Sequence, residues 1–568
     1  MKRLFVINIV LWMLLIPYIS SGEPPSTALQ PLPPVEQGKN LYEDQLDRGI
    51  KNSVPYSYML IEQVRANKAR TKDILNEALK YSPDLPAAYF ELAKENLIFS
   101  PREIFKTVDY MRQGIASYNR NFWWLFTITG SLFLSAVLSL IISTVIIILI
   151  RLLFDISLLS HDIKENKSKA LLLLLLPISA LFGPLFLIGS VLLIIGLYMK
   201  SVDKISVYLY LLFLVISPLI FNTASTFLSA PASGKIKAVV QVNESRDNKY
   251  ALSVLKKRNN HVEHFSYALA AKREGGYNDA IDIYNKLMPS PIVFNNLANC
   301  YVAINDIEKA KELYKKSVEL QPLPAALYNL SIVSRETLEF EKGDEYFLSA
   351  QKLAPDAVSW FRTIFSKNPN RFVIDENLPM STLWEYVFEK THSTINFSIA
   401  PQNLTPAIAL TIAILFYILN KYFKHRAYRC KRCGKVLCTK CEKHVLWGRM
   451  CQQCYKSLIK IGELDAKERI TILLAVYEHQ KRRRSMIKII SFIMPGLGLI
   501  YAGNVLYGLF FLWSFLFLLF LPISNWLFVP EMPGFSHTWL SMCSLLFMGL
   551  VYITSNLITL RRLSRGWL

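Results

Sequence analysis

Catalytic signatures are the first thing that the sequence lacks. Its 568 residues contain no phosphate-binding loop for nucleotides, no metalloprotease helix, no nucleophile elbow and no cluster typical of a synthase. The long apolar runs also carry almost no charge, whereas ion transporters usually hold ionisable residues within the membrane. We therefore predict no catalytic residue, no enzyme activity and no small-molecule substrate.

Cysteine is scarce outside one stretch. The chain has 8 cysteines, and six of them form three C-x2-C pairs, which are Cys430/Cys433, Cys438/Cys441 and Cys451/Cys454. Two intervening residues let both sulfurs of a tight turn face one ion, and four thiolates close a tetrahedral zinc site. The first and third pairs predict a zinc ribbon with one structural Zn²⁺.

A second zinc ion is left open. The middle pair, Cys438 and Cys441, needs more ligands, and only His425 and His444 lie nearby, whereas a treble-clef-like double site requires about eight ligands. The alternative is a disulfide cluster in an oxidising compartment. Basic residues on both sides favour a reducing, cytoplasmic location instead. A closed site of four thiolates has no position for a substrate, so we expect a structural or docking module.

Apolar residues, by contrast, are abundant. They make up 52% of the chain, and the mean hydropathy of +0.27 is too high for a soluble protein of this size. Long apolar runs account for the excess and predict a mainly α, multi-pass membrane protein. The formal net charge is +21, and much of the basic excess borders the apolar runs. This favours anionic lipid headgroups as partners and leaves nucleic acid as a minor alternative.

The first half of the chain divides into an exported part and a membrane part. Residues 1–22 predict a signal peptide, with an uncleaved anchor as the alternative. Residues 23–118 predict an exported helical region, in which residues 74–93 resemble the joint between two tetratricopeptide (TPR) repeats. Residues 122–230 form a membrane block of about three apolar segments, Phe122–Ile150, Leu171–Met199 and Ile205–Phe221.

Residues 240–355 contain a repeat. Small residues recur at Ala280, Ala310 and Gly343, where the two helices of a repeat would touch. Aromatic residues recur at Tyr284, Tyr314 and Phe347, between repeats. This pattern resembles the TPR family, which implies an α-solenoid whose concave groove binds partner proteins. A different antiparallel helical bundle is the alternative, and the pattern does not show which side chains would contact a ligand.

The second half alternates between membrane and polar segments. In chain order we predict a cap and tether (356–403), a transmembrane helix (404–420), the zinc ribbon (425–456), a basic amphipathic helix (457–485), a membrane hairpin (486–560) and a cytoplasmic tail (561–568). The run from Pro495 to Gly503, followed by Gly508, resembles the Pro-Gly-x-Gly core of TM2-type double-span domains. Such glycines permit helices to approach closely.

The predicted topology contains a conflict. Three full spans after an exported N-terminus would leave residues 231–403 in the cytoplasm, whereas the basic cluster after residue 420 places them outside. We expect Leu171–Met199 not to cross simply, because Pro177 and Gly183-Pro184 interrupt it. The array is then periplasmic and the ribbon cytoplasmic.

The overall layout resembles bacterial inner-membrane TPR proteins with a C-terminal C-x2-C cluster. This resemblance brings no established activity, and it favours a non-enzymatic scaffold that recruits partner proteins on both sides of the bacterial inner membrane. The alternative is a membrane-tethered regulatory protein whose ribbon binds nucleic acid or senses zinc or thiol oxidation.

Overall fold

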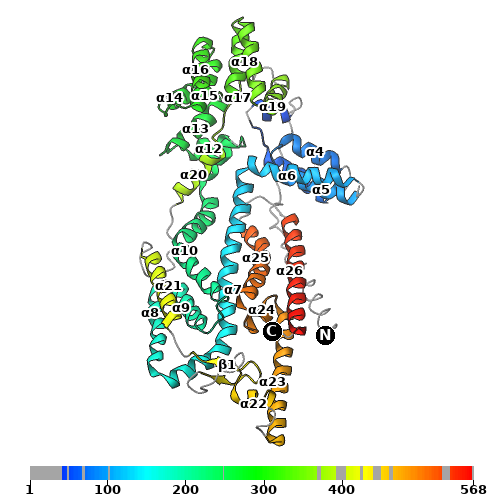
Figure 1. Cartoon of the computed structure of the whole chain (residues 1–568). Coiled ribbons are helices and arrows are strands. Elements are labelled where there is room, and N and C mark those ends of the chain that lie inside the picture. Colours follow the sequence, from blue (N-terminus) through cyan, green and yellow to red (C-terminus); the bar gives the residue numbers. More distant parts are fainter. Residues whose placement is uncertain are drawn as a thin grey trace.

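The computed structural model describes residues 41–47, 50–66, 71–99, 103–246, 248–367, 373–391, 404–422, 426–438, 450–459, 465–527 and 538–565. The predicted signal peptide lies outside these residues. The described chain is mainly helical, as its sequence predicts, and its one sheet there pairs β1 (Tyr428–Arg429) antiparallel with β2 (Val436–Leu437). Figure 1 shows helical units at one end, long helices in the middle and the small sheet at the other end.

The N-terminal unit consists of short helices. They are α2 (Leu41–Asp47), α3 (Val54–Ala66), α4 (Thr71–Tyr81), α5 (Pro86–Phe99), α6 (Ile104–Ser117) and the 3₁₀ helix η2 (Tyr118–Arg120). The TPR-like joint of the sequence falls on α4 and α5, which pack together through buried Leu75 and Leu92. Asp84, between these helices, forms ion pairs with Lys51 and Arg120. These contacts fix the unit to the chain that enters the long helices.

The middle level contains the apolar helices. They are α7 (Phe122–Glu165), η3 (Lys167–Leu174), α8 (Leu175–Phe182), α9 (Pro184–Gly196), α10 (Ile205–Ser229), η4 (Ala230–Ala232), α21 (Thr405–Tyr422), α25 (Val505–Leu527) and α26 (Thr538–Ser564). Among the described helices, α7, α10, α21, α25 and α26 are long and apolar enough to span a bilayer. α25 packs along α7, and α21 packs along α10.

The apolar run Leu171–Met199 is divided rather than continuous. Gly183 has φ +120°, a conformation that favours glycine, and Pro184 begins a new helix directly after it. Both ends of the divided run lie beside Asp162, which contacts Lys169 at 3.2 Å and accepts a hydrogen bond from Tyr198. The run therefore leaves and returns to the same end of the bundle.

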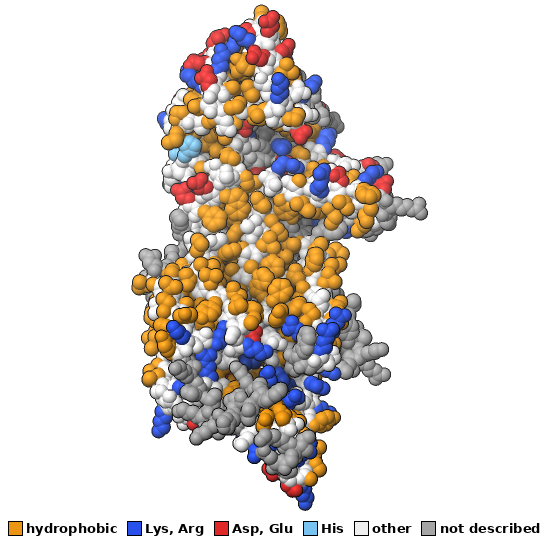
Figure 2. Space-filling view, viewed as in Figure 1, with side chains coloured by type: hydrophobic (Ala, Val, Ile, Leu, Met, Phe, Trp, Pro, Cys, Tyr) orange, Lys and Arg blue, Asp and Glu red, His pale blue; other side chains and the backbone are white. Residues whose placement is uncertain are grey.

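An apolar band crosses the middle of the face that Figure 2 shows. Figure 2 shows hydrophobic side chains forming this band, with Lys and Arg gathered along its lower edge. At this end Arg426 donates to the carbonyl of Leu197 at 2.8 Å, and Arg429 donates to the carbonyl of Phe154 at 2.6 Å. These basic side chains satisfy carbonyl groups of the apolar segments and hold the chain after α21 against them.

The helical array at the upper end contains three helix pairs. They are α13 (His261–Arg273) with α14 (Tyr277–Tyr284), α15 (Pro291–Ala303) with α16 (Ile307–Leu320), and α17 (Pro324–Glu336) with α18 (Phe340–Leu353). Flanking helices are α11 (Gly234–Asn243), α12 (Asn248–Val254), α19 (Pro355–Lys367) and α20 (Met380–Lys390). The small residues Ala280 and Ala310 and the aromatic residues Tyr284 and Tyr314 are all buried, as the repeat pattern predicts.

The described part of the segment between the array and the apolar helix α21 packs more closely than its polar sequence suggests. Trp384 of α20 lies among Phe122 and Phe126 of α7 and Phe227 of α10, with ring centroids 5.2 to 6.2 Å apart. Tyr386 donates a hydrogen bond to the buried Glu263 of α13 at 3.1 Å. α20 therefore joins the array to the upper ends of two apolar helices.

The C-terminal part differs from the predicted boundaries. The segment predicted as one amphipathic helix at 457–485 contains the end of α22 (Gln452–Leu458) and most of α23 (Ala466–Ile493). α23 continues past residue 485 because Ile487 and Ser491 are buried against the following hairpin. α24 (Leu497–Tyr501) follows, and Gly496, at φ +83°, lies against the backbone of Gly508. A side chain at Gly496 would not fit.

Candidate peptide-binding groove and candidate metal centre

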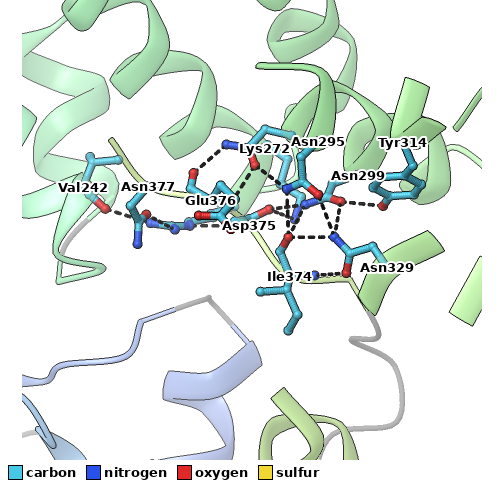
Figure 3. A network of polar contacts seen from close by, with 12 residues as sticks. Val242, Lys272, Asn295, Asn299, Tyr314, Asn329, Ile374, Asp375, Glu376 and Asn377 are labelled. Atoms are coloured by element: carbon cyan, nitrogen blue, oxygen red, sulfur yellow. Dashed lines mark hydrogen bonds and ion pairs between the residues drawn. The ribbon is translucent and has the colours of Figure 1, made fainter. Parts of the chain in front are cut away.

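An extended segment of the chain itself occupies the inner face of the array. We call residues Val373–Pro379 the groove segment. The backbone N–H groups of Ile374, Glu376 and Leu378 each donate to an asparagine, at 2.7, 2.8 and 2.9 Å; the first two asparagines belong to the array and the third is Asn243 of the flanking helix α11. This two-residue period is that of a β-strand, although the bonds run to side chains rather than to a neighbouring strand. Figure 3 shows the segment passing beside the side chains of Asn295, Asn299 and Asn329.

Two asparagines each bind one residue of the groove segment through two hydrogen bonds. Asn329 of α17 accepts from the N–H of Ile374 and donates to its carbonyl at 2.9 Å. Asn296 of α15 binds Glu376 in the same way, with both bonds at 2.8 Å. An amide side chain matches the donor and acceptor of one backbone residue, so this recognition does not depend on the side chain at that position.

Further polar side chains orient these asparagines. Asn295 and Asn299 of α15 also donate to the carbonyl of Ile374, at 3.1 and 3.0 Å, and each accepts a bond from Asn329. Tyr314 donates to Asn299 at 2.5 Å. All four asparagines are fully buried. Because a buried amide without a partner is costly, the network defines one orientation for each side chain.

One side chain of the groove segment is recognised by charge. Asp375 pairs with Lys272 at 2.7 Å and Arg273 at 3.2 Å, both on α13, and accepts from Asn299 at 2.8 Å. The side chains of Asp375, Lys272 and Arg273 are 4%, 7% and 3% exposed. Arg273 also donates to Asn377 at 2.9 Å. The groove therefore combines backbone recognition with a buried position for an aspartate.

Burial also affects the next acidic residue. It raises the pKa of Glu376 to about 7, and the neighbouring charge of Asp375 adds to the increase, while the N–H of Ala325 opposes it. The pKa of Cys300, on α15, is raised to about 12 mainly by burial. Cys300 is thus a core thiol of the array.

The repeat pattern identifies the structural residues of the array but misses its binding residues. Gly343 replaces the usual small alanine because a β-carbon there would contact the backbone oxygen of Ser331 at 3.0 Å and crowd Arg335. The asparagines were not predicted. A signal exists, however: Asn295 and Asn329 are 34 residues apart, and asparagine is unfavourable inside helices unless its side chain has a specific partner.

The second candidate site is a cluster of four cysteines. Cys430 and Cys433 lie on the turn between β1 and β2, and Cys451 and Cys454 lie at the start of α22. Their sulfur atoms are all within 4.8 Å of one another, and three of the four residues are buried. No disulfide links them. Four convergent thiols fit a tetrahedral metal ion, and Zn²⁺ is the ion that such a donor set prefers.

The backbone around the cluster favours the ionised form of one of the four thiols, that of Cys430. Burial raises the pKa of Cys430, but the N–H groups of Cys433, Cys451 and Arg432 outweigh this and lower it to about 7. Burial and the neighbouring thiols raise the pKa of Cys451 to about 11. The thiols therefore repel one another once ionised, and a cation would relieve this repulsion.

Of the middle cysteine pair, Cys438 alone lies within the described residues, and it is not part of this cluster. Cys438 is buried at the end of β2, outside the group of four sulfurs. Cys441, His425 and His444 lie outside the described residues, so the predicted second zinc ion stays a prediction.

The cysteine module is attached to the lower end of α7. The N–H of Ala427 donates to the buried Asp162 at 3.0 Å, and Arg429 binds the carbonyl of Phe154 and the hydroxyl of Ser157. Gln480 of α23 donates to the carbonyls of Lys431 and Arg432, at 2.9 and 2.8 Å. The module is therefore held between α7 and α23.

These features define a helical-repeat protein with an occupied groove and a separate cysteine module. Residues 293–322, which cover α15 and α16, match the tetratricopeptide repeat family. The chain is also 39% identical over 66 residues to mitochondrial import receptor subunit TOM70 from two strains of Saccharomyces cerevisiae. This similarity covers 10% of the chain and 11% of that relative, so the chain spans about a tenth of the length of the curated relatives it matches. The prediction of TPR repeats is confirmed for this part of the chain.

Proposed function

We propose that this protein is a membrane-anchored adaptor, without catalytic activity, whose TPR groove binds an extended segment of a partner protein. The observation that carries the proposal is the pair of asparagines, Asn296 and Asn329, which each bind both backbone groups of one extended residue. Recognition of backbone through side-chain amides suits a linear peptide, since it requires no folded partner surface. The similarity to an import receptor subunit supports a protein-binding role.

The apolar helices are proposed to span a membrane and to place the two modules on opposite sides of it. The N–H of Phe122, at one end of α7, donates to the carboxylate of Glu244 beside the array, and Asp162, near the other end, binds the cysteine module. A helix of 44 residues is about 66 Å long, at 1.5 Å per residue, which exceeds the ~30 Å of a bilayer core. α7 can therefore contact both modules directly.

Zn²⁺ is proposed to be the ion that stabilises the cysteine module. When bound to Cys430, Cys433, Cys451 and Cys454, it would supply structural cross-linking without an open coordination position. The basic residues Arg426 and Arg429 are directed to carbonyls of the apolar segments. This arrangement favours membrane attachment over the alternative in which the module binds nucleic acid.

We further propose a bacterial inner membrane, with the array periplasmic and the module cytoplasmic.

Crosslinking in cells tests the adaptor function. Proteins that crosslink to the wild-type chain are compared with those that crosslink to a variant carrying Asn296→Ala and Asn329→Ala. The matched control is Asn285→Ala, an exposed asparagine at the end of α14. We expect the double variant to lose specific partners and the control to keep them. The same partners on all three proteins, or no specific partner on any, would contradict the proposal.

A further inference from the structure

The groove segment combines the polar contacts of a bound ligand with apolar packing, since Val373 and Leu378 lie against the buried core that includes the array, and Ile374 lies against a second apolar cluster around Tyr328. Its backbone N–H groups at three alternate residues donate to asparagine side chains, and its buried Asp375 is paired with Lys272 and Arg273. Asn377 of the segment also accepts a hydrogen bond from Arg273. An extended chain with an aspartate at the matching position, and apolar residues at the positions of Val373, Ile374 and Leu378, would present the same groups to the groove.

The groove segment can leave without loss of the tether that follows it. α20 is anchored by the aromatic cluster around Trp384 and by Glu263, which contacts both Tyr386 and Lys390. None of these contacts involves residues 373–379. Displacement of the segment would therefore expose the groove while the array stays attached to α7 and α10.

We propose that the groove segment is an internal competitor that occupies the partner site, and that the partner carries an extended acidic segment with an aspartate matching Asp375. This inference rests on the proposed adaptor function, because it names the ligand and the regulation of the same groove. The partner's aspartate binds Lys272 and Arg273, and its backbone binds Asn296 and Asn329. Binding then requires that the internal segment be displaced.

The covalent connection gives the internal segment a large advantage. A tethered ligand acts at an effective concentration on the order of 1 mM when its linker is short. A free peptide with the same contacts therefore competes poorly with the wild-type groove. If the internal segment is disabled, the free peptide should bind at least about 100-fold more tightly, provided that its intrinsic Kd is about 10 μM or lower.

The test uses a fluorescent peptide with the sequence of residues 373–380 and the full-length protein in detergent. In the opened variant, residues 374–377 are replaced by Gly-Ser-Gly-Ser. We expect little anisotropy change with wild-type protein and saturable binding to the opened variant. A peptide with Asp375→Ala should bind the opened variant at least 10-fold more weakly. Adding Asn296→Ala and Asn329→Ala to the opened variant should abolish binding, whereas adding Asn285→Ala should not.

Two results would overturn the inference. One is an opened variant with wild-type helical content that binds no peptide. The other result applies if the opened variant does not fold, in which case the milder Asp375→Ala protein replaces it. If this protein binds the peptide no more tightly than wild type does, the segment is a fixed part of the array. Peptide binding without any partner in cells would contradict the adaptor function alone. Crosslinked partners without peptide binding would contradict the internal competitor alone.

Discussion

Removal of a single asparagine should release one defined residue of the groove segment. Asn329→Ala deletes both bonds to Ile374, whose N–H then has no acceptor among the contacts seen in the groove. A buried donor left unpaired costs about 1–3 kcal/mol. Because about 1.4 kcal/mol changes an equilibrium tenfold, local opening should become roughly 5- to 150-fold more frequent. The overall fold should persist, since the helices of the array remain packed.

Hydrogen exchange measured by mass spectrometry, with fragmentation to single residues, is the appropriate assay. The amide of Ile374 should exchange about 5- to 150-fold faster in Asn329→Ala. In Asn296→Ala the largest increase should occur instead at Glu376, which that side chain binds. The control Asn285→Ala should leave both amides unchanged. Unaltered exchange at Ile374, or a uniform increase across the array, would refute the assignment of these asparagines as backbone receptors.

Three other perturbations have defined outcomes. Gly496→Ala should destabilise the hairpin by about 2–5 kcal/mol, because it combines a positive φ with overpacking against Gly508. The control Gly549→Ala has open space around the added methyl group and should not destabilise the hairpin. The thermal unfolding midpoint of each purified variant measures the change in stability. Cys430→Ser should remove one zinc ion per chain by mass spectrometric metal analysis and Cys438→Ser should not; equal metal content would contradict the four-thiol site. Glu376 binds a proton more tightly in the folded state, because its pKa there is about 7 against an ordinary 4.5. The stability of the fold should therefore decrease as the pH rises from about 4.5 to about 7, by at most about 1.4 kcal/mol per pH unit. Thermal unfolding of Glu376→Gln at several pH values should show no such decrease.

The sequence predicts those parts of the fold that depend on periodic packing. Small and aromatic residues such as Ala310 and Tyr314 recur because helix pairs must touch, and both are buried as expected. The C-x2-C spacing likewise predicts that Cys430, Cys433, Cys451 and Cys454 converge, and their sulfurs do lie together. Each of these signals is local or repeated, so neighbouring residues alone are enough to show it.

The occupied groove was not predictable in the same way. The contact between Asn295 and Ile374 joins positions 79 residues apart, and nothing in the polar sequence around Ile374 distinguishes a ligand from a linker. The role of Trp384 was missed for a similar reason, because its partners Phe122 and Phe227 lie far away in the chain. Such contacts depend on the tertiary arrangement and leave little trace in local composition.

The path of the divided apolar run, Leu171–Met199, is predictable from the sequence only in part. Pro177 and Gly183-Pro184 indicate an interruption, but hydropathy alone counts a third span. In the structure both ends of the run lie near Asp162, which contacts Lys169 and Tyr198. Within the described residues before the array, α7 and α10 are therefore the helices that connect the two ends of the bundle. The N-terminal unit and the array then lie at the same end, in agreement with the position of the basic cluster.

The array and the cysteine module are proposed to lie on opposite sides of a membrane. The most direct test inserts one protease site after Met288, in the exposed loop between α14 and α15, and another after Ile459, beyond α22. Protease is then added to sealed vesicles of each orientation. We expect the two sites to be cut in opposite vesicle orientations. Cleavage of both sites in the same orientation would contradict it.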